Sequence, residues 1–150
     1  MSGRIAARLK SLGIELAAVP APVANYVPFV RSGPWVFVSG QLPPARFAGI
    51  VGKDLGLDEA RQAARAAAVN VLAVLSAAIG DLDKVARVVK LTGFVNAAPG
   101  FVQHPEVVNG ASDLFVEVFG EAGRHARAAV GASSLPRNAA VEIDAVFEVA

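Results

Sequence analysis

Residues 139–149 constrain the fold more than any other stretch, because apolar and charged residues alternate along them one by one. One side of the alternation carries Ala139, Val141, Ile143, Ala145, Phe147 and Val149. The other side carries Glu142, Asp144 and Glu148. A period of two is typical of a β-strand that packs one face on a core. The sequence therefore predicts a sheet with one buried face, in which this stretch is a strand.

A second short strand is predicted at residues 127–131, ahead of a Pro- and Asn-containing loop at 133–138. If the two strands pair, Arg127 and Glu142 lie close together on a sheet that otherwise carries little charge. Small neighbours in the strand would leave the guanidinium group at the bottom of a pocket. A guanidinium group is a planar fork that suits a carboxylate, and a glutamate can position or deprotonate water. The pair therefore predicts hydrolysis of a small acid.

The rest of the pattern predicts an α+β domain with two helices over one face of a mixed sheet. Apolar residues at helical spacing predict helices at 4–12, 58–80 and 105–120. The other predicted strands are 26–31 and 35–39, which form a hairpin, and 85–96, which is expected to be covered on both faces. Asp58 is the expected N-cap of the long helix. Pro20 and Pro22 are expected to hold an extended linker.

Composition excludes several classes of function. With 54% hydrophobic and 18% charged residues, the chain is apolar for its 150 residues, which favours burial of part of its surface in an oligomer. The absence of cysteine excludes disulfides and thiolate nucleophiles. The two histidines, His104 and His125, have no paired spacing that would indicate a metal site. A net charge of +1 does not favour nucleic acid.

The sequence also gives an expectation about location. The charge-free run at 66–80 is shorter than the roughly 20 residues that span a bilayer. Residues 1–5 lack the long apolar core of a secretory signal. We therefore expect no membrane insertion and, by default, a cytoplasmic location.

Each candidate side chain also has an ordinary structural explanation. Arg127 would be a surface arginine paired with an acid, and Glu142 would belong to a solvated strand face. Tyr26 would be a half-buried strand tyrosine and Asn109 a solvent-facing helix residue. Ser39, which precedes a glycine at the end of an apolar run, would serve the turn or would line a small anion pocket. Both interpretations stay open on the residues alone.

Two further arrangements involve the histidines. A Ser-His-Asp triad of Ser39, His104 and Asp113 has no nucleophile-elbow pattern to support it. His125 is expected to point to the opposite face of the strand from Arg127, in a structural role. Neither histidine is therefore expected to take part in catalysis.

Four short motifs, taken in order and spacing, identify a family resemblance. They are Val36 to Pro43 (VFVSGQLP), Val108-Asn109 ahead of Leu114-Phe115, Ala126-Arg127, and Val141 to Val146 (VEIDAV). In these the chain resembles the Rid family, the YjgF-like proteins also labelled L-PSP endoribonuclease. The resemblance covers most of the chain, from about residue 25 to residue 149.

The resemblance implies a chorismate-mutase-like (bacillary type) α+β fold, assembled as a homotrimer with clefts between subunits. Studied members hydrolyse 2-enamine and 2-imine acids, such as 2-aminoacrylate, to 2-oxo acids and ammonia without a cofactor. Arg127 matches the arginine that clamps the substrate carboxylate, and Glu142 matches the glutamate associated with the attacking water. Tyr26, Ser39 and Asn109 match other positions of the substrate pocket.

The chain departs from the family pattern at three places. Ala24-Asn25 stands where Gly-Pro usually precedes the tyrosine, His125 replaces a proline before the Ala-Arg pair, and Ala129 replaces a common cysteine. These departures indicate a divergent subgroup whose substrate differs.

The expectation for the whole chain is one Rid-like domain at 1–150, with an N-terminal extension at 1–19 and a loop at 44–56 that shapes specificity. The expected activity is imine and enamine deamination, with a small imino or enamino acid as partner and neither nucleic acid nor membrane. The alternative is a non-catalytic trimer that binds a small carboxylate as a sensor. A third possibility is the ribonuclease activity of the family label, against which the near-neutral charge argues.

Overall fold

The computed structural model describes residues 3–19 and 24–150. Pro20 and Pro22, the expected linker prolines, lie outside the described residues. The helices are α1 (Arg4–Ser11), α2 (Leu57–Ile79) and α3 (His104–Phe119), with short 3-10 turns at Ala45–Phe47, Leu82–Lys84, Gly120–Gly123 and Pro136–Asn138. The strands are β1 (Phe29–Ser32), β2 (Trp35–Gln41), β3 (Val85–Asn96), β4 (Ala126–Ala132) and β5 (Val141–Val149).

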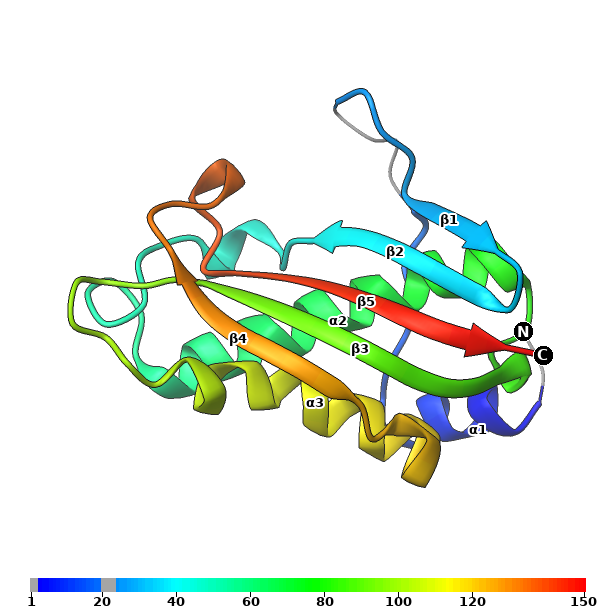
Figure 1. Cartoon of the computed structure of the whole chain (residues 1–150). Coiled ribbons are helices and arrows are strands. Elements are labelled where there is room, and N and C mark those ends of the chain that lie inside the picture. The colour runs from blue at the N-terminus through cyan, green and yellow to red at the C-terminus, as the bar shows by residue number, and fades with distance from the viewer. Residues whose placement is uncertain (1–2, 20–23) are drawn as a thin grey trace.

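The described strands form one mixed sheet in the order β1-β2-β5-β3-β4, with α2 and α3 on one face (Figure 1). β3 and β4 are parallel, and the other neighbours are antiparallel. This is the chorismate-mutase-like α+β fold with two helices on one face, as the sequence predicts. The predicted hairpin is confirmed, with Ser32 opposite Trp35 and Gly33 at φ 59° in the turn between them.

The last two strands do not pair, although the expected proximity of Arg127 and Glu142 depended on such a pairing, because β3 lies between β4 and β5. After β3 the chain crosses over through α3 and returns parallel to β3 as the edge strand β4. A crossover through a helix produces a parallel neighbour, whereas a short loop would have produced a hairpin. β5 then runs antiparallel to both β2 and β3, in the centre of the sheet.

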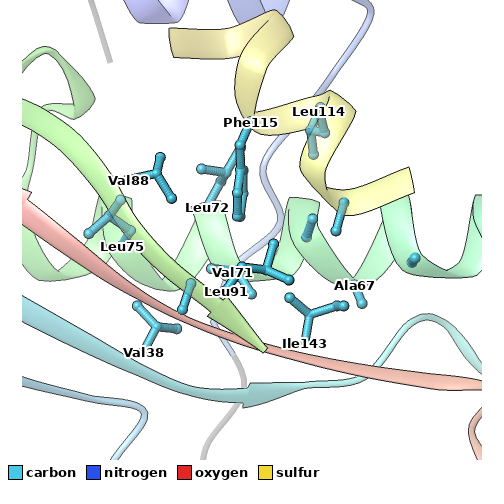
Figure 2. Packing of buried hydrophobic residues seen from close by; sticks show 14 of the residues in the cluster. Val38, Ala67, Val71, Leu72, Leu75, Val88, Leu91, Leu114, Phe115 and Ile143 are labelled. Atoms are coloured by element: carbon cyan, nitrogen blue, oxygen red, sulfur yellow. The ribbon is translucent and has the colours of Figure 1, made fainter. Parts of the chain in front are cut away.

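The core lies between the sheet and the helices (Figure 2). Val71, Leu72 and Leu75 of α2 and Leu114 and Phe115 of α3 are buried against the strands. Every second residue of β5 joins them, as the alternation predicts; these are Val141, Ile143, Ala145, Phe147 and Val149. Along β5 the covered face of the sheet is therefore apolar throughout.

The other face of the sheet, here called the open face, has no helix packed on it among the described residues. It includes large apolar side chains that are 39–52% exposed: Val30, Trp35, Phe37 and Val130. β3 sends Thr92 and Phe94 to this face, where both are only partly buried. The prediction that β3 is covered on both faces is therefore wrong for a single chain.

The N-cap of the long helix lies two residues earlier than expected. Its N-cap is Gly56, and Asp58 lies in the first turn rather than at the cap. The Gly56 amide donates to Glu59 Oε1 at 3.4 Å. By length and composition α2 would be able to cross a membrane. However, its apolar residues pack against the sheet and α3, which is the behaviour of a core helix.

The N-terminal helix is tied to a distant part of the chain. Gly3, its N-cap, has no side chain to accept from the first free amides, and Asp83 does so instead. The carboxylate of Asp83 accepts from the amides of Arg4 at 2.9 Å and Ile5 at 2.8 Å. These two bonds lower the pKa of Asp83. Ile5 and Leu9 are buried in the same core as the other helices, so α1 is an integral layer of the fold.

Candidate functional site

Arg127 lies on β4 and turns toward α3. Its Nη1 donates to Ser112 Oγ at 3.0 Å and its Nη2 donates to the Pro105 carbonyl at 3.1 Å. Both acceptors belong to α3, so the guanidinium group lies across the outside of that helix rather than between alanines in a strand pocket. No carboxylate pairs with Arg127 in the described part of the chain. Its other N–H groups remain free to bind an anion.

His125 lies beside Arg127, and the prediction that it points to the opposite face is wrong. Residues two apart along an extended chain share a face. His125 Nε2 lies 2.9 Å from Ser112 Oγ, and Nδ1 lies 2.6 Å from the Gly123 carbonyl oxygen. Burial lowers the pKa of His125, the hydrogen bond to Gly123 opposes this, and the charge of Arg127 lowers it further. The imidazole is therefore neutral near neutral pH.

Asn109 belongs to the same region of α3. It follows Pro105 by four residues and precedes Ser112 by three, and residues at these spacings share a helix face. It is half-buried. Asn109 therefore shares a face of α3 with Pro105 and Ser112, the two residues that Arg127 contacts. Ser112 is not among the residues that the motif comparison named.

Glu142 lies on β5 and faces the open side of the sheet. Its Cα partner on β3 is Phe94. Its carboxylate lies over Gly40, where a Cβ atom would collide with it. Burial raises the pKa of Glu142, and the neighbouring charge of Asp144 raises it further. A glutamate with a raised pKa is a stronger base than one in water, which fits the role of activating a water molecule.

Ser39 lies on β2 beside β5, and Tyr26 lies in the segment that precedes β1. β2 has a register shift between Val38 and Gln41, so that Ser39 and Gly40 bulge beside β5. Ser39 Oγ donates to the Val27 carbonyl at 2.7 Å and thereby fixes the segment that carries Tyr26. The Tyr26 side chain is 47% exposed. It extends from the sheet rather than being half-buried in a strand.

Within one chain these residues form two half-sites. The arginine half-site is Asn109, Ser112, His125 and Arg127, and the glutamate half-site is Tyr26, Ser39, Gly40 and Glu142. β4 and β5 are two strand spacings apart, about 10 Å, and Arg127 and Glu142 lie on opposite faces of the sheet. The expectation that they lie close together on one sheet is therefore wrong for a single chain.

Other arrangements weighed from the sequence do not form. Ser39 on β2 bonds to Val27, whereas His104 lies against Gly131 on β4 and Asp113 is exposed on α3. The three residues therefore do not make a triad. No group of three His, Asp or Glu side chains within residues 3–19 and 24–150 has the geometry to hold a metal ion.

Two open hollows flank α1. One lies between α1 and the C-terminal half of α3, and the other lies beside the turn that follows α1. Neither is lined by any residue of the two half-sites.

Known proteins resemble this chain over nearly its whole length. The family described as YjgF/chorismate mutase-like, which also carries an endoribonuclease label, matches residues 6–148. Protein TCP17 of Trypanosoma cruzi is 52% identical over 153 residues, which cover 99% of this chain and 96% of the relative.

Solved structures show the same fold. The protein Atu1372 of Agrobacterium tumefaciens, of unknown function, is 52% identical with a TM-score of 0.90, over 97% of this chain and 92% of that one. E. coli TdcF, solved with bound serine, is 25% identical with a TM-score of 0.62, over 88% of this chain and 94% of that one. The chain is therefore a member of the YjgF-like, or Rid, family.

Proposed function

We propose that this protein hydrolyses 2-enamine and 2-imine acids, such as 2-aminoacrylate, to 2-oxo acids and ammonia. The observation that carries the proposal is the state of Arg127. Its guanidinium group is held by two hydrogen bonds to α3, yet it has no carboxylate partner in the described residues. A positioned arginine without a counter-ion is suited to bind the carboxylate of a small acid.

The reaction follows from the two half-sites. Arg127 binds the substrate carboxylate and fixes the orientation of the adjacent C=N carbon, which promotes reaction through positioning. Glu142 accepts a proton from water, and the hydroxide oxygen bonds to the imine carbon. A 2-enamine acid first becomes the imine, as a proton moves from its nitrogen to its terminal carbon. After the hydroxide bonds to the imine carbon, Glu142 returns its proton to the nitrogen. The new hydroxyl then loses its proton to the nitrogen, the C–N bond breaks as the C=O bond of the 2-oxo acid forms, and ammonia leaves. The reaction requires no cofactor. We also propose that the protein is located in the cytoplasm.

A second chain would complete the site. Because Arg127 and Glu142 are on opposite faces of one sheet, an intact site combines the arginine half-site of one chain with the glutamate half-site of another. The open face supports such an assembly, since it exposes Val30, Trp35 and Phe37 around the sheet. We propose that the assembly is a homotrimer, in which each chain contributes to two sites. A ring of heterologous contacts is a closed symmetry that gives this arrangement.

A relative's ligand supports the substrate class. E. coli TdcF was solved with bound serine, a small amino acid with a carboxylate and an amino group on the same carbon. 2-Imine acids have the same carboxylate and nitrogen arrangement. A 2-imine acid therefore has the size and charge that the arginine half-site is proposed to bind.

The first experiment measures 2-oxo acid formation from imines that an amino-acid oxidase generates in situ, across a panel of amino acids. We expect the wild type to accelerate hydrolysis and Arg127→Ala to lower kcat/KM by about 100-fold or more. Arg124→Ala is the matched control, because Arg124 makes only an exposed ion pair with Glu121. If the wild type accelerates no imine but binds a 2-oxo acid, the protein is the non-catalytic carboxylate-binding trimer instead.

The second experiment tests whether two chains share a site. Arg127→Ala and Glu142→Gln chains, each inactive alone, are unfolded together, refolded as a mixture and assayed. Random mixing in a closed three-chain ring is expected to restore about a quarter of the wild-type activity. Mixing the folded variants without subunit exchange is the control and should restore nothing. Absence of recovery in refolded mixtures of the correct size would contradict the shared site.

A further inference from the structure

We propose that Ser112 and His125 are positioning residues, which together hold Arg127 in the orientation that receives the substrate carboxylate. This inference rests on the proposed function of Arg127 as the carboxylate clamp. Its evidence is independent, however, because it comes from the contacts of Ser112 and His125 themselves. Neither residue belongs to the motifs that carry the family resemblance.

The hydrogen-bond chain has a single consistent direction. The Gly123 carbonyl can only accept, so the proton of the neutral His125 ring is on Nδ1, 2.6 Å away. Nε2 is then a bare acceptor, and the Ser112 hydroxyl 2.9 Å away must donate to it. The lone pairs of Ser112 Oγ are thereby left to accept from Arg127 Nη1 at 3.0 Å. Each group in the chain fixes the orientation of the next.

The His125 end of this hydrogen-bond chain packs against the hydrophobic core. The His125 ring packs edge-on against Phe115, with ring centroids 5.9 Å apart and an interplanar angle of 80°. Phe115 is fully buried. Gly123 is buried as well, and a Cβ atom there would collide with the Phe115 carbonyl. The imidazole ring is therefore fixed by the core, and it transmits that rigidity through Ser112 to the guanidinium group.

Fixing the arginine in advance should strengthen carboxylate binding. A free arginine side chain has several rotatable bonds, and ordering them on binding opposes affinity. In this structure Ser112 and Pro105 hold one N–H on each terminal nitrogen, so three of the five N–H groups remain for a ligand. Loss of the Ser112 contact should therefore raise KM and the Kd for a carboxylate more than it lowers kcat.

The test uses 2-oxobutyrate, a stable 2-oxo acid, as the probe of the full-length protein. Kd is measured by calorimetry, and the Arg127 Nε–H signal is followed by NMR, assigned with Arg127→Lys. We expect Ser112→Ala and His125→Leu to weaken binding about tenfold, as removal of a hydrogen bond to a charged group does. In these variants the NMR signal of Arg127 should change from that of a rigid side chain to that of a side chain that averages over several conformations. KM should rise by a similar factor with little change in kcat.

Conservative variants separate positioning from general structure. Ser112→Thr keeps the hydroxyl and His125→Gln keeps an acceptor that reaches it, so both should stay within about threefold of the wild-type Kd. Asp113→Ala, an exposed neighbour on the same helix, should leave Kd unchanged. His125→Leu tests the chain from its other end if Ser112→Ala does not fold.

The outcomes distinguish this inference from the proposed function. If the wild type hydrolyses no imine but its Arg127 signal is immobilised and depends on Ser112, the reaction fails and the positioning role stands. If imines are hydrolysed but Ser112→Ala and His125→Leu leave Kd, KM and the Arg127 signal unchanged, the positioning role fails alone. An averaged Arg127 signal in the wild type also overturns it.

Discussion

The two faces of the sheet are built from the same strands but differ in what they need from outside the chain. On the covered face, Val36, Phe147 and Ile143 are fully buried beneath α2 and α3. On the open face, Phe37 remains 47% exposed although it lies between core residues in sequence. Its cross-strand partner is Val146, and beyond it lie the half-buried carboxylates of Glu142 and Asp144.

The difference shows which part of the sequence specifies the fold and which part specifies assembly and chemistry. The covered face is satisfied within one chain, because apolar residues meet apolar residues from two helices. The open face combines exposed aromatic side chains with carboxylates of raised pKa. For Asp144, a hydrogen bond to Thr92 and the charge of Lys90 oppose the effect of burial, whereas nothing opposes it for Glu142. Burial of a carboxylate without a counter-ion is unfavourable, so the presence of Glu142 beside apolar residues favours a functional explanation.

The largest expected effect is a difference in stability between Phe→Ala substitutions on the two faces of the sheet. Phe147→Ala should destabilise the protein by about 3–5 kcal/mol, because it removes a fully buried ring and leaves a cavity. Phe37→Ala, on the neighbouring strand, should change the stability of a single chain by less than about 1 kcal/mol. Urea unfolding at low protein concentration measures both. Equal losses would show that the open face is as necessary to the fold as the covered face.

An intermediate effect concerns association. Phe37→Asp places a charge in the exposed apolar region of the open face, and we expect it to weaken self-association by about 100-fold or more, as loss of a central aromatic contact does. The sedimentation coefficient should fall to that of one chain while far-UV circular dichroism is unchanged. Val102→Asp is the control, since Val102 is 75% exposed on the loop before α3. An assembly of wild-type size in Phe37→Asp would place the interface elsewhere.

The smallest effect concerns Glu142 and pH. Its pKa in the folded protein is raised, so the folded state binds a proton more readily than the unfolded state does. The resulting stability is present below the unfolded pKa and is lost as the pH rises through the folded pKa. Glu142→Gln should therefore be more stable than the wild type at pH 7, by about 0.5 kcal/mol.

The same variant should show no advantage near pH 3, where the wild-type carboxyl is protonated in both states. Thermal unfolding at both pH values measures the difference. An advantage that persists at pH 3 would have a cause other than the carboxylate charge. Activity, in contrast, should fall at pH 7, where the wild-type carboxylate is able to accept a proton from water.

Most of the elements were predictable because each has a local cause. The helix α2 follows from apolar residues at helical spacing and from Gly80, which ends it. The strand β3 follows from a run rich in Val, Leu and Phe. The order of strands was not predictable in the same way, since it depends on how α3 returns the chain to the sheet. The assumption that β4 pairs with β5 led to the expectation that Arg127 and Glu142 lie close together, whereas the fold separates them.

The arginine half-site shows a different limit. Period two along the chain was sufficient to place His125 beside Arg127, and the prediction of opposite faces misapplied it. Ser112 was harder to find, because a serine in a helix carries no signal until the strand that faces it is known. Asn109 came from the resemblance alone, whereas Arg127 came from the strand pattern as well. The contact of Arg127 with Ser112 came only from the three-dimensional structure.

The central position of β5 has a consequence for how the chain reaches its folded state. β5 follows every other described strand in sequence, yet it joins β2 to β3. During synthesis the β1-β2 hairpin and the β3-α3-β4 unit therefore emerge first, each with an unpaired inner edge. Such edges are sites of misassociation while they wait. Folding of the nascent chain is thus expected to be completed only after β5 leaves the ribosome, and early release of the chain would favour aggregation.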